Sequence, residues 1–305
     1  NFDVEGQSAK SLDPALVRRF DRRVYIDLPR KEDPTRTKVR KYGFLTSLLV
    51  MLVAIIYLLV DLWVIPAKNE KLKEELITLY HPEKSTVVVT PEEAEKNHYP
   101  ENMLASFTDL YDRNDEVRGW ISYHATGKTD FLDMEYPIVY SGDNSKYLKK
   151  DFDGNKNRNG TLFFDQNNQV NSYYDRNRAL IVYGHNMANG SMFADVHKFK
   201  KKDFFDSHQY LYVYLPGHVL TYRIYSLFSH NPRHLLWAYD FETEEGCQKF
   251  IDKTLNPKTS IKRVRDGVSP TPADRLITLS TCVDASADTD RLLLVAVLES
   301  DILTK

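Results

Sequence analysis

The sequence predicts a mainly β domain, closed or sandwiched, that follows one long apolar helix. Three observations predict it. From about residue 120 onward the apolar runs are short and bounded by Asn, Asp or Gly, as strands usually are. Few helical stretches interrupt these runs. Residues 44–65 form an apolar stretch in which Asp61 is the single charged residue. Many short strands with few helices are typical of barrels and sandwiches.

The first 43 residues are polar and basic. They contain 11 Lys or Arg against 7 Asp or Glu, together with three prolines, and we interpret residues 1–43 as a mostly disordered cytoplasmic tail. The whole chain carries a net charge of −2, so the part after residue 65 is mildly acidic. An acidic main domain lacks the basic footprint of a nucleic-acid-binding protein, and we expect no nucleic-acid partner.

Residues 44–65 have the length and composition of a transmembrane anchor. As a helix they span about 33 Å, enough to cross the apolar core of a bilayer and contact its lipid. Basic residues precede the stretch, which predicts a cytoplasmic N-terminus and an outer C-terminus; they are Arg36, Lys38, Arg40 and Lys41. A buried core helix of this length would show polar breaks, and "VIPAKNE" is a poor signal-peptidase site. We therefore predict a single-pass, uncleaved anchor.

Residues 66–100 are expected to be a stalk and linker. Leu72, Leu76 and Leu79 have helical spacing within residues 67–80, and a polar stretch follows. The folded domain is predicted to cover residues 101–305. It should begin with a helix that ends near Gly119.

The rest of the folded domain is read as strands with two helices. The predicted strands are "YPIVYS", "TLFFD", "ALIVYG", "YLYVYL", "VLTYRIYSLFS", "RLITLSTC" and "RLLLVAVLES". The helices are "SMFADVHKF" and "ETEEGCQKFIDKTL". In the second helix Cys247 shares an apolar face with Phe250 and Ile251, so we read it as a core residue.

The other cysteine, Cys282, stands at the end of a predicted strand, and Arg291 opens the next. If the two strands form a hairpin, a guanidinium lies beside a thiol, where it favours the thiolate and can bind an oxyanion. A cysteine nucleophile also needs a proton partner. His185 leaves the strand "ALIVYG" directly after Gly184, which we expect to provide a tight bend. Taken alone, a free cysteine is more often a small buried hydrophobe, and a Cys247–Cys282 disulfide is an open alternative.

The combination resembles the sortase family. "TLSTC" at 278–282 matches the sortase signature Thr-Leu-any-Thr-Cys, with an arginine at the start of the following strand and a histidine about a hundred residues earlier. Five further motifs are similar to class B sortases: "GW" at 119–120, "YPIV" at 136–139, "DNSKYL" at 143–148, "YGHNM" at 183–187 and "GSMFADV" at 190–196. The resemblance covers roughly residues 101–299.

The resemblance implies a closed sortase-type β-barrel with N-terminal helices and a helix in the connection before the catalytic strands. It implies Cys282 as nucleophile, His185 as acid/base and Arg291 as the oxyanion or substrate clamp. Substrate-binding roles are expected for Asn144, Leu148, Tyr183, Ser280 and Thr281. The implied protein is a membrane-anchored bacterial transpeptidase with its catalytic domain outside the cell.

Such an enzyme cleaves a C-terminal sorting signal of a surface protein after Thr, forms a thioester and passes the acyl group to an amine of a peptidoglycan precursor or a pilin. Class B resemblance suggests a signal of the Asn-Pro-x-Thr type. An alternative is a cysteine peptidase that releases the peptide to water; another is a binding domain on the same scaffold. No cofactor or metal is expected. "DFDGNKNRNGTL" at 151–162 begins like a calcium loop but has Lys156 and Leu162 where such loops need Gly and Glu.

Overall fold

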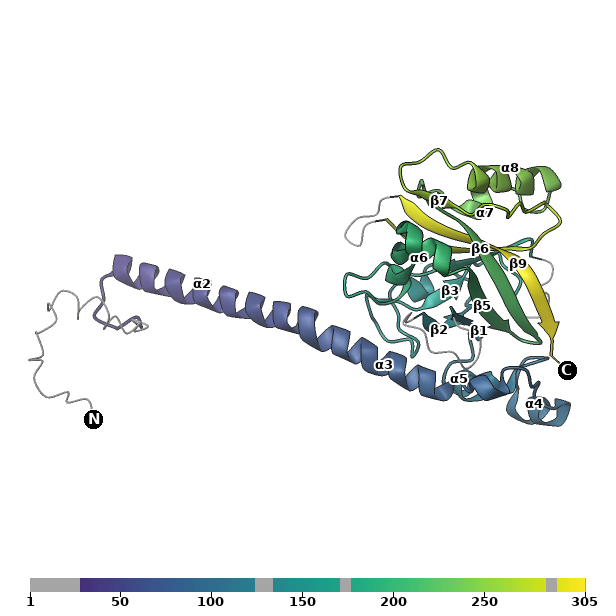
Figure 1. The fold of residues 1–305 in the computed structure, drawn as a ribbon. Helices are drawn as coiled ribbons and strands as arrows, with labels where there is room; N and C mark the ends of the chain where they lie inside the picture. The colour runs from purple at the N-terminus through teal and green to yellow at the C-terminus, as the bar shows by residue number, and fades with distance from the viewer. Residues whose placement is uncertain (1–27, 124–133, 171–176, 284–289, 305) are drawn as a thin grey trace, which may run out of the picture. The chain divides into compact units, whose positions relative to one another are not determined.

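The computed structural model describes residues 28–123, 134–170, 177–283 and 290–304, and it divides into two compact units, Asn1–Ile65 and Pro66–Lys305. In the first unit the main element is helix α2 (Thr35–Leu59), which continues into a short π-helical segment, η1 (Val60–Val64) (Figure 1). No residue of α2 is buried. The predicted tail up to residue 27 lies outside the described residues.

Helix α2 is the first part of a longer helical stretch, Thr35–Lys84, which is long and apolar enough to cross a membrane. It is the one such stretch among the residues that the structure describes. Two hydroxyl groups in its apolar stretch bond within the helix. The hydroxyl of Thr46 donates to the carbonyl of Tyr42, and that of Ser47 donates to the carbonyl of Phe44 at 2.8 Å. This back-bonding satisfies both hydroxyls without a partner outside the helix.

Short helices open the second unit: α3 (Ile65–Leu79), η2 (Pro82–Lys84), α4 (Pro91–Asn97), η3 (Ala105–Phe107) and α5 (Thr108–Arg113). Near the end of α3, Leu76 and Tyr80 are buried. The ring of Tyr80 stacks on that of Trp120 in the barrel, with centroids 4.2 Å apart and planes 7° from parallel. The segment expected to be stalk and linker therefore contributes side chains to a core cluster of the second unit.

Helix α5 ends at Arg113, so the expected helix end near Gly119 was wrong. The cause is Asn114. Its Oδ1 accepts the backbone N–H of Glu116 at 3.0 Å, and its Nδ2 donates to the carbonyl of Phe152 at 2.6 Å. An asparagine that bonds the backbone in this way competes with the helix and stops it. Gly119 lies in the first strand.

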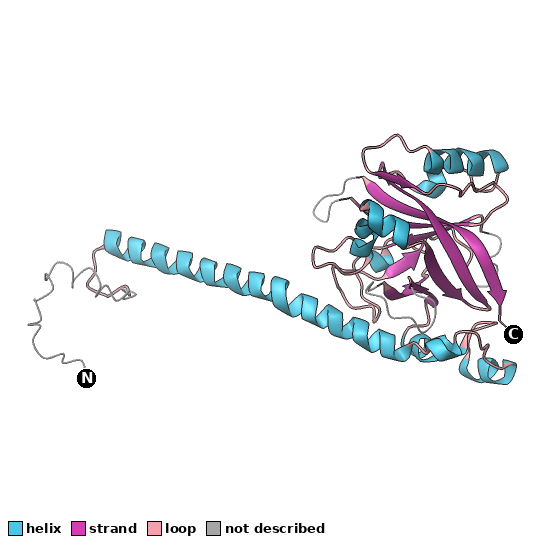
Figure 2. Cartoon of the chain, in the orientation of Figure 1, coloured by secondary structure: helices cyan, strands magenta, loops and turns pink. Residues whose placement is uncertain are grey.

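The strands are β1 (Val117–Ser122), β2 (Glu135–Val139), β3 (Leu162–Phe164), β4 (Ala179–Tyr183), β5 (Tyr210–Leu215), β6 (His218–His230), β7 (Lys262–Val264), β8 (Leu276–Cys282) and β9 (Arg291–Leu303). They form one sheet in the order β5-β1-β2-β3-β4-β8-β9-β6-β7 (Figure 2). Because β5 also pairs with β6, eight strands close into a barrel and β7 extends one strand outside it. The predicted mainly β fold, with its closed barrel and N-terminal helices, is confirmed.

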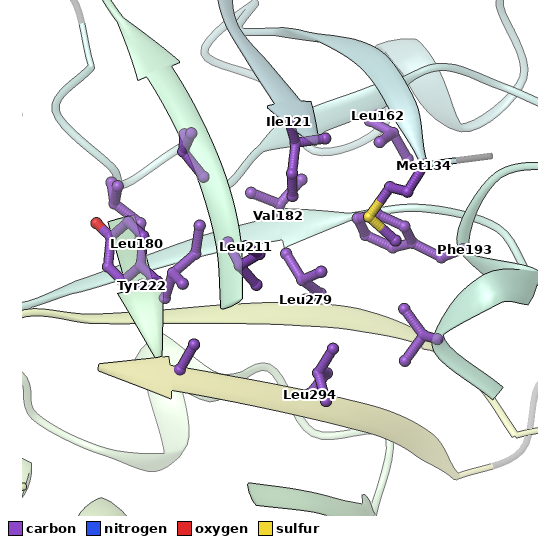
Figure 3. Close-up of a cluster of buried hydrophobic side chains, with 14 of the residues drawn as sticks. Ile121, Met134, Leu162, Leu180, Val182, Phe193, Leu211, Tyr222, Leu279 and Leu294 are labelled. Carbon is purple, nitrogen blue, oxygen red and sulfur yellow. The ribbon is translucent and has the colours of Figure 1, made fainter. Parts of the chain in front are cut away.

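Apolar side chains from facing strands meet inside the barrel (Figure 3). Ile121, Val182, Leu211, Leu279 and Leu294 are all fully buried there. Alternate residues of each strand point inward, so β8 sends Ile277 and Leu279 inside and Leu276 to the outer face. The outer face of β8 is also covered, which explains why nearly the whole strand is buried and reads as apolar.

The outer cover comes from the long connection between β6 and β7, which contains α7 (Leu235–Ala238) and α8 (Glu244–Leu255). The hydroxyl of Thr243 caps α8 by accepting the N–H of Gly246 at 3.1 Å. Cys247, Phe250 and Ile251 are buried against β6 and β9, as the apolar face predicted. Among the described residues, the other short helices are η4 (Lys146–Leu148), η6 (Phe193–Lys200) and α6 (Lys202–Ser207).

We predict that α3 stabilises the barrel. Leu76→Ala should lower the free energy of unfolding by about 2–5 kcal/mol, because a buried leucine is replaced by a cavity. Its neighbour Ile77 is 40% exposed, so Ile77→Ala is a matched control that should cost less than about 1 kcal/mol. The free energy of unfolding of each variant is measured by urea denaturation of residues 66–305, with tryptophan fluorescence as the signal. An equal decrease in the free energy of unfolding of the two variants would show that α3 does not pack specifically.

Candidate active site

Cys282 and Arg291 face each other at one end of the barrel. They form the last backbone pair of the antiparallel β8–β9 ladder. The guanidinium Nη1 of Arg291 donates to Sγ of Cys282 at 2.7 Å. The predicted hairpin geometry is therefore present at the described residues. The loop that joins the two strands, residues 284–289, lies outside them.

The carbonyl of Cys282 is held from the other side. Nε2 of His197, on η6, lies 3.0 Å from this oxygen, and Nδ2 of Asn186 lies 3.3 Å from it. A carbonyl can only accept, so both nitrogens donate to it. The backbone of Cys282 is thus fixed at the point where the ladder ends. This contact could not be predicted from the sequence, because nothing in the pattern around His197 indicates where η6 packs.

His185 reaches the same end of the barrel because β4 and β8 run parallel, with Tyr183 opposite Ser280. Its Nε2 lies 2.8 Å from the carbonyl oxygen of Leu148 and must donate to it. Nδ1 is the ring nitrogen that this bond does not use. The expected bend at Gly184 has a different physical basis: a Cβ there would lie 2.4 Å from Leu162 Cδ2 and 2.6 Å from Phe193 Cδ2. Glycine is needed for close packing.

A cavity of about 190 Å³ joins these groups. Its lining residues are Asn144, Leu148, Phe163, Tyr183, Gly184, His185, His230, Pro232, Arg233, His234, Leu235, Ser280, Cys282, Arg291 and Leu293. Both charged and apolar side chains contribute, and they come from segments far apart in the sequence. The cavity therefore offers both polar and apolar groups to a ligand that reaches the thiol.

Burial sets the protonation of two groups in this cavity. It raises the pKa of Tyr183 far above its usual range, an effect to which the carboxylate of Asp165 adds. Tyr183 therefore keeps its proton and can donate. Burial also lowers the pKa of His230, whose Nδ1 contacts the carbonyl of Asn231 at 2.7 Å. A neutral His230 adds no second positive charge beside its backbone partner Arg291.

A family model described as the sortase domain matches residues 129–299. The chain belongs to the sortase family. Among curated proteins, sortase B of Staphylococcus aureus is 26% identical over 197 residues, covering 65% of this chain and 75% of that protein. Sortase B of Listeria monocytogenes is 31% identical over 176 residues, covering 57% of this chain and 65% of that protein.

Solved structures agree. Sortase B from Bacillus anthracis in complex with AAEK1 has a TM-score of 0.60 and 26% identity, covering 80% of this chain and all of that one. Clostridium perfringens sortase B has a TM-score of 0.52 and 28% identity, covering 64% of this chain and all of that one. The relatives support class B. The chain is thus a sortase transpeptidase, and the family acts on proteins that carry a sorting signal.

Most of the residues predicted for this sortase's site come together. Asn144, Leu148, Tyr183 and Ser280 line the cavity with Cys282, His185 and Arg291. Thr281 does not: it alternates with Ser280 along β8, is 2% exposed and does not line the cavity. It is buried beside the site.

Sequence reasoning missed the residues at the end of β6 and directly after it. His230, Pro232, Arg233, His234 and Leu235 all line the cavity, although they had no distinctive context in the sequence. A helix in this connection was expected, but a sequence pattern does not reveal onto which face of the barrel a connection folds. Two histidines four residues apart, His230 and His234, were the available signal.

The two cysteines of this sortase should differ sharply in reactivity. Cys247 is 3% exposed and burial raises its thiol pKa, whereas Cys282 lies in the cavity beside a guanidinium. Iodoacetamide should therefore add one carbamidomethyl group to the native protein, at Cys282, as read by peptide mass spectrometry. Cys247→Ala should keep that single addition and Cys282→Ala should lose it. Faster labelling of Cys247 would contradict this assignment.

Proposed function

We propose that this sortase is a membrane-anchored transpeptidase that cleaves a sorting signal after Thr, holds the protein as a thioester on Cys282 and transfers it to an amine. The observation that carries the proposal is the 2.7 Å contact between Arg291 and the Cys282 thiol in a cavity that His185 also lines. A nucleophile, a fixed cation and an imidazole at one cavity are the parts that acyl transfer needs.

In the first half of the reaction, the Cys282 thiolate attacks the threonyl carbonyl carbon and forms a C–S bond. Negative charge collects on the carbonyl oxygen, and the guanidinium of Arg291 stabilises it as the sulfur gives up its own charge. Protonated His185 then gives its Nδ1 proton to the leaving nitrogen, the C–N bond breaks and the C-terminal part of the signal departs. The thioester and neutral His185 remain.

In the second half, an amine attacks the thioester carbonyl. Neutral His185 takes a proton from the attacking nitrogen, the C–S bond breaks and the thiolate of Cys282 returns. A new amide bond joins the protein to the acceptor. Splitting the transfer into two steps avoids direct attack of an amine on an amide. We propose an amine of a peptidoglycan precursor or a pilin as the acceptor.

The anchor is assigned to residues 44–65. Support comes from α2, which covers most of this stretch, has no buried residue and has Thr46 and Ser47 bonded back to its own carbonyls. The basic residues before it favour a cytoplasmic N-terminus. The catalytic domain then lies outside the cell, where surface proteins and cell wall precursors meet.

The reaction is tested with the full chain in detergent and a peptide of the Asn-Pro-x-Thr type, with and without an amine acceptor. The amine should raise the total rate of peptide cleavage and yield a transpeptidation product. Cys282→Ala should give no product. His185→Ala and Arg291→Ala should each lose at least ~10²-fold in rate. Cys247→Ala is the matched control and should keep activity. Peptide release to water that is unaffected by amine would instead identify a peptidase.

The topology is tested by protease added to intact cells or spheroplasts. The domain after residue 66 should be digested, and an N-terminal tag should be spared until the membrane is permeabilised. This outcome follows from the basic flank before the anchor. Protection of the catalytic domain in intact cells would reverse the assigned orientation.

A further inference from the structure

One buried carboxylate near the cavity has no part in the reaction described above. Asp165 follows β3 directly and is fully buried. A buried charge is costly unless donors surround it. Its Oδ1 accepts the backbone N–H and the side-chain Nδ2 of Asn167, at 2.8 and 3.0 Å. These two bonds hold the carboxylate within its own loop.

The other oxygen, Oδ2, reaches three cavity-lining residues. The hydroxyl of Tyr183 donates to it at 2.9 Å, and Nδ2 of Asn144 donates at 3.2 Å. Nε2 of His234 lies 2.6 Å away and donates as well, since a carboxylate can only accept. Tyr183 ends β4, Asn144 precedes η4, and His234 precedes α7. One oxygen therefore links three segments that lie far apart in the sequence.

Asn144 and Tyr183 are oriented to donate to the Asp165 carboxylate. Oδ1 of Asn144 accepts the backbone N–H of Gln166 at 2.8 Å, which fixes the orientation of the amide and directs Nδ2 toward Asp165. Tyr183 keeps its proton, because burial and the Asp165 charge raise its pKa. Burial opposes the charge on Asp165, but hydrogen bonds from His234, Asn167 and Tyr183 outweigh burial and lower its pKa below the ordinary value. The carboxylate is therefore charged at neutral pH.

We propose that Asp165 is a positioning residue for sorting-signal recognition: its carboxylate holds Asn144, Tyr183 and His234 together as one wall of the substrate cavity. This inference rests on the proposed function, in which that cavity receives the peptide. Asn144 and Tyr183 then act on the peptide through the position of the wall, since their donor atoms already bond to Asp165. None of the bonds described for Asp165 involves Cys282, His185 or Arg291, so loss of the wall should weaken peptide binding and spare the chemistry.

The test uses the full chain in detergent with an Asn-Pro-x-Thr-type peptide and an amine acceptor. Asp165→Asn has the same shape but replaces an acceptor oxygen with an amide, which cannot accept from three donors. We expect its KM for the peptide to rise at least ~10-fold, with kcat within ~3-fold of wild type. The rate of Cys282 alkylation by iodoacetamide should stay within ~2-fold. Asp203→Asn, an exposed carboxylate on α6, is the matched control and should change nothing.

His234 gives a second test that does not alter the carboxylate. His234→Gln keeps an N–H donor for Asp165 and should retain most of the wild-type KM. His234→Ala removes the donor and should raise KM as Asp165→Asn does. This rescue separates a positioning role from a general loss of structure, because a merely destabilised site would not distinguish glutamine from alanine.

The failure of this inference differs from a failure of the proposed function. If Asp165→Asn lowers kcat or alkylation at an unchanged KM, or matches wild type in all three measurements, the positioning role is wrong while transpeptidation stands. If the wild-type chain shows no amine-dependent product although Cys282 alkylates normally, the proposed function fails first.

Discussion

The register between β4, β8 and β9 is the constraint on which the site depends. Tyr183 lies opposite Ser280 in the parallel β4–β8 pair, and Cys282 lies opposite Arg291 in the antiparallel β8–β9 pair. A shift of one residue in either ladder would turn every side chain to the other face. The buried core prevents such a shift, because Ile277 and Leu279 would leave the barrel interior. Core packing therefore sets the 2.7 Å contact between guanidinium and thiol.

The scaffold supplies the ends of strands, and the connections supply the cavity. Cys282 and Arg291 lie on strands, whereas the opposite side is formed by the segment after β6 and by the region around η4. These segments are not strands of the sheet. A buried charge can do so, because Asp165 is stable only while several donors surround it. The cost of burying the charge thus enforces the arrangement of the donors.

The helices that precede the barrel in the second unit are part of its folded core. Leu76 and Tyr80 are buried in the cluster that contains Trp120. Because Trp120 lies in β1, next to β2 and β5 in the barrel, the start of the second unit and the barrel share a core. Removal of residues 66–100 would expose this surface to water.

The amino-acid sequence was sufficient to predict the mainly β class, the strands, and the thiol of Cys282 with the imidazole and guanidinium that share its cavity. These features depend on local sequence or on short motifs. The spacing of apolar residues and the turn residues between them indicate strands, and the motifs "TLSTC" and "YGHNM", together with Arg291, mark strand ends. Three-dimensional packing was needed to show that Thr281 is buried away from the cavity, that Gly184 is required by its close neighbours and that Leu76 belongs to the core. It was also needed to bring Asp165, His234 and His197 to the site. Their contacts join residues 18 to 85 positions apart, so they depend on how connections fold across the barrel, which no local pattern encodes.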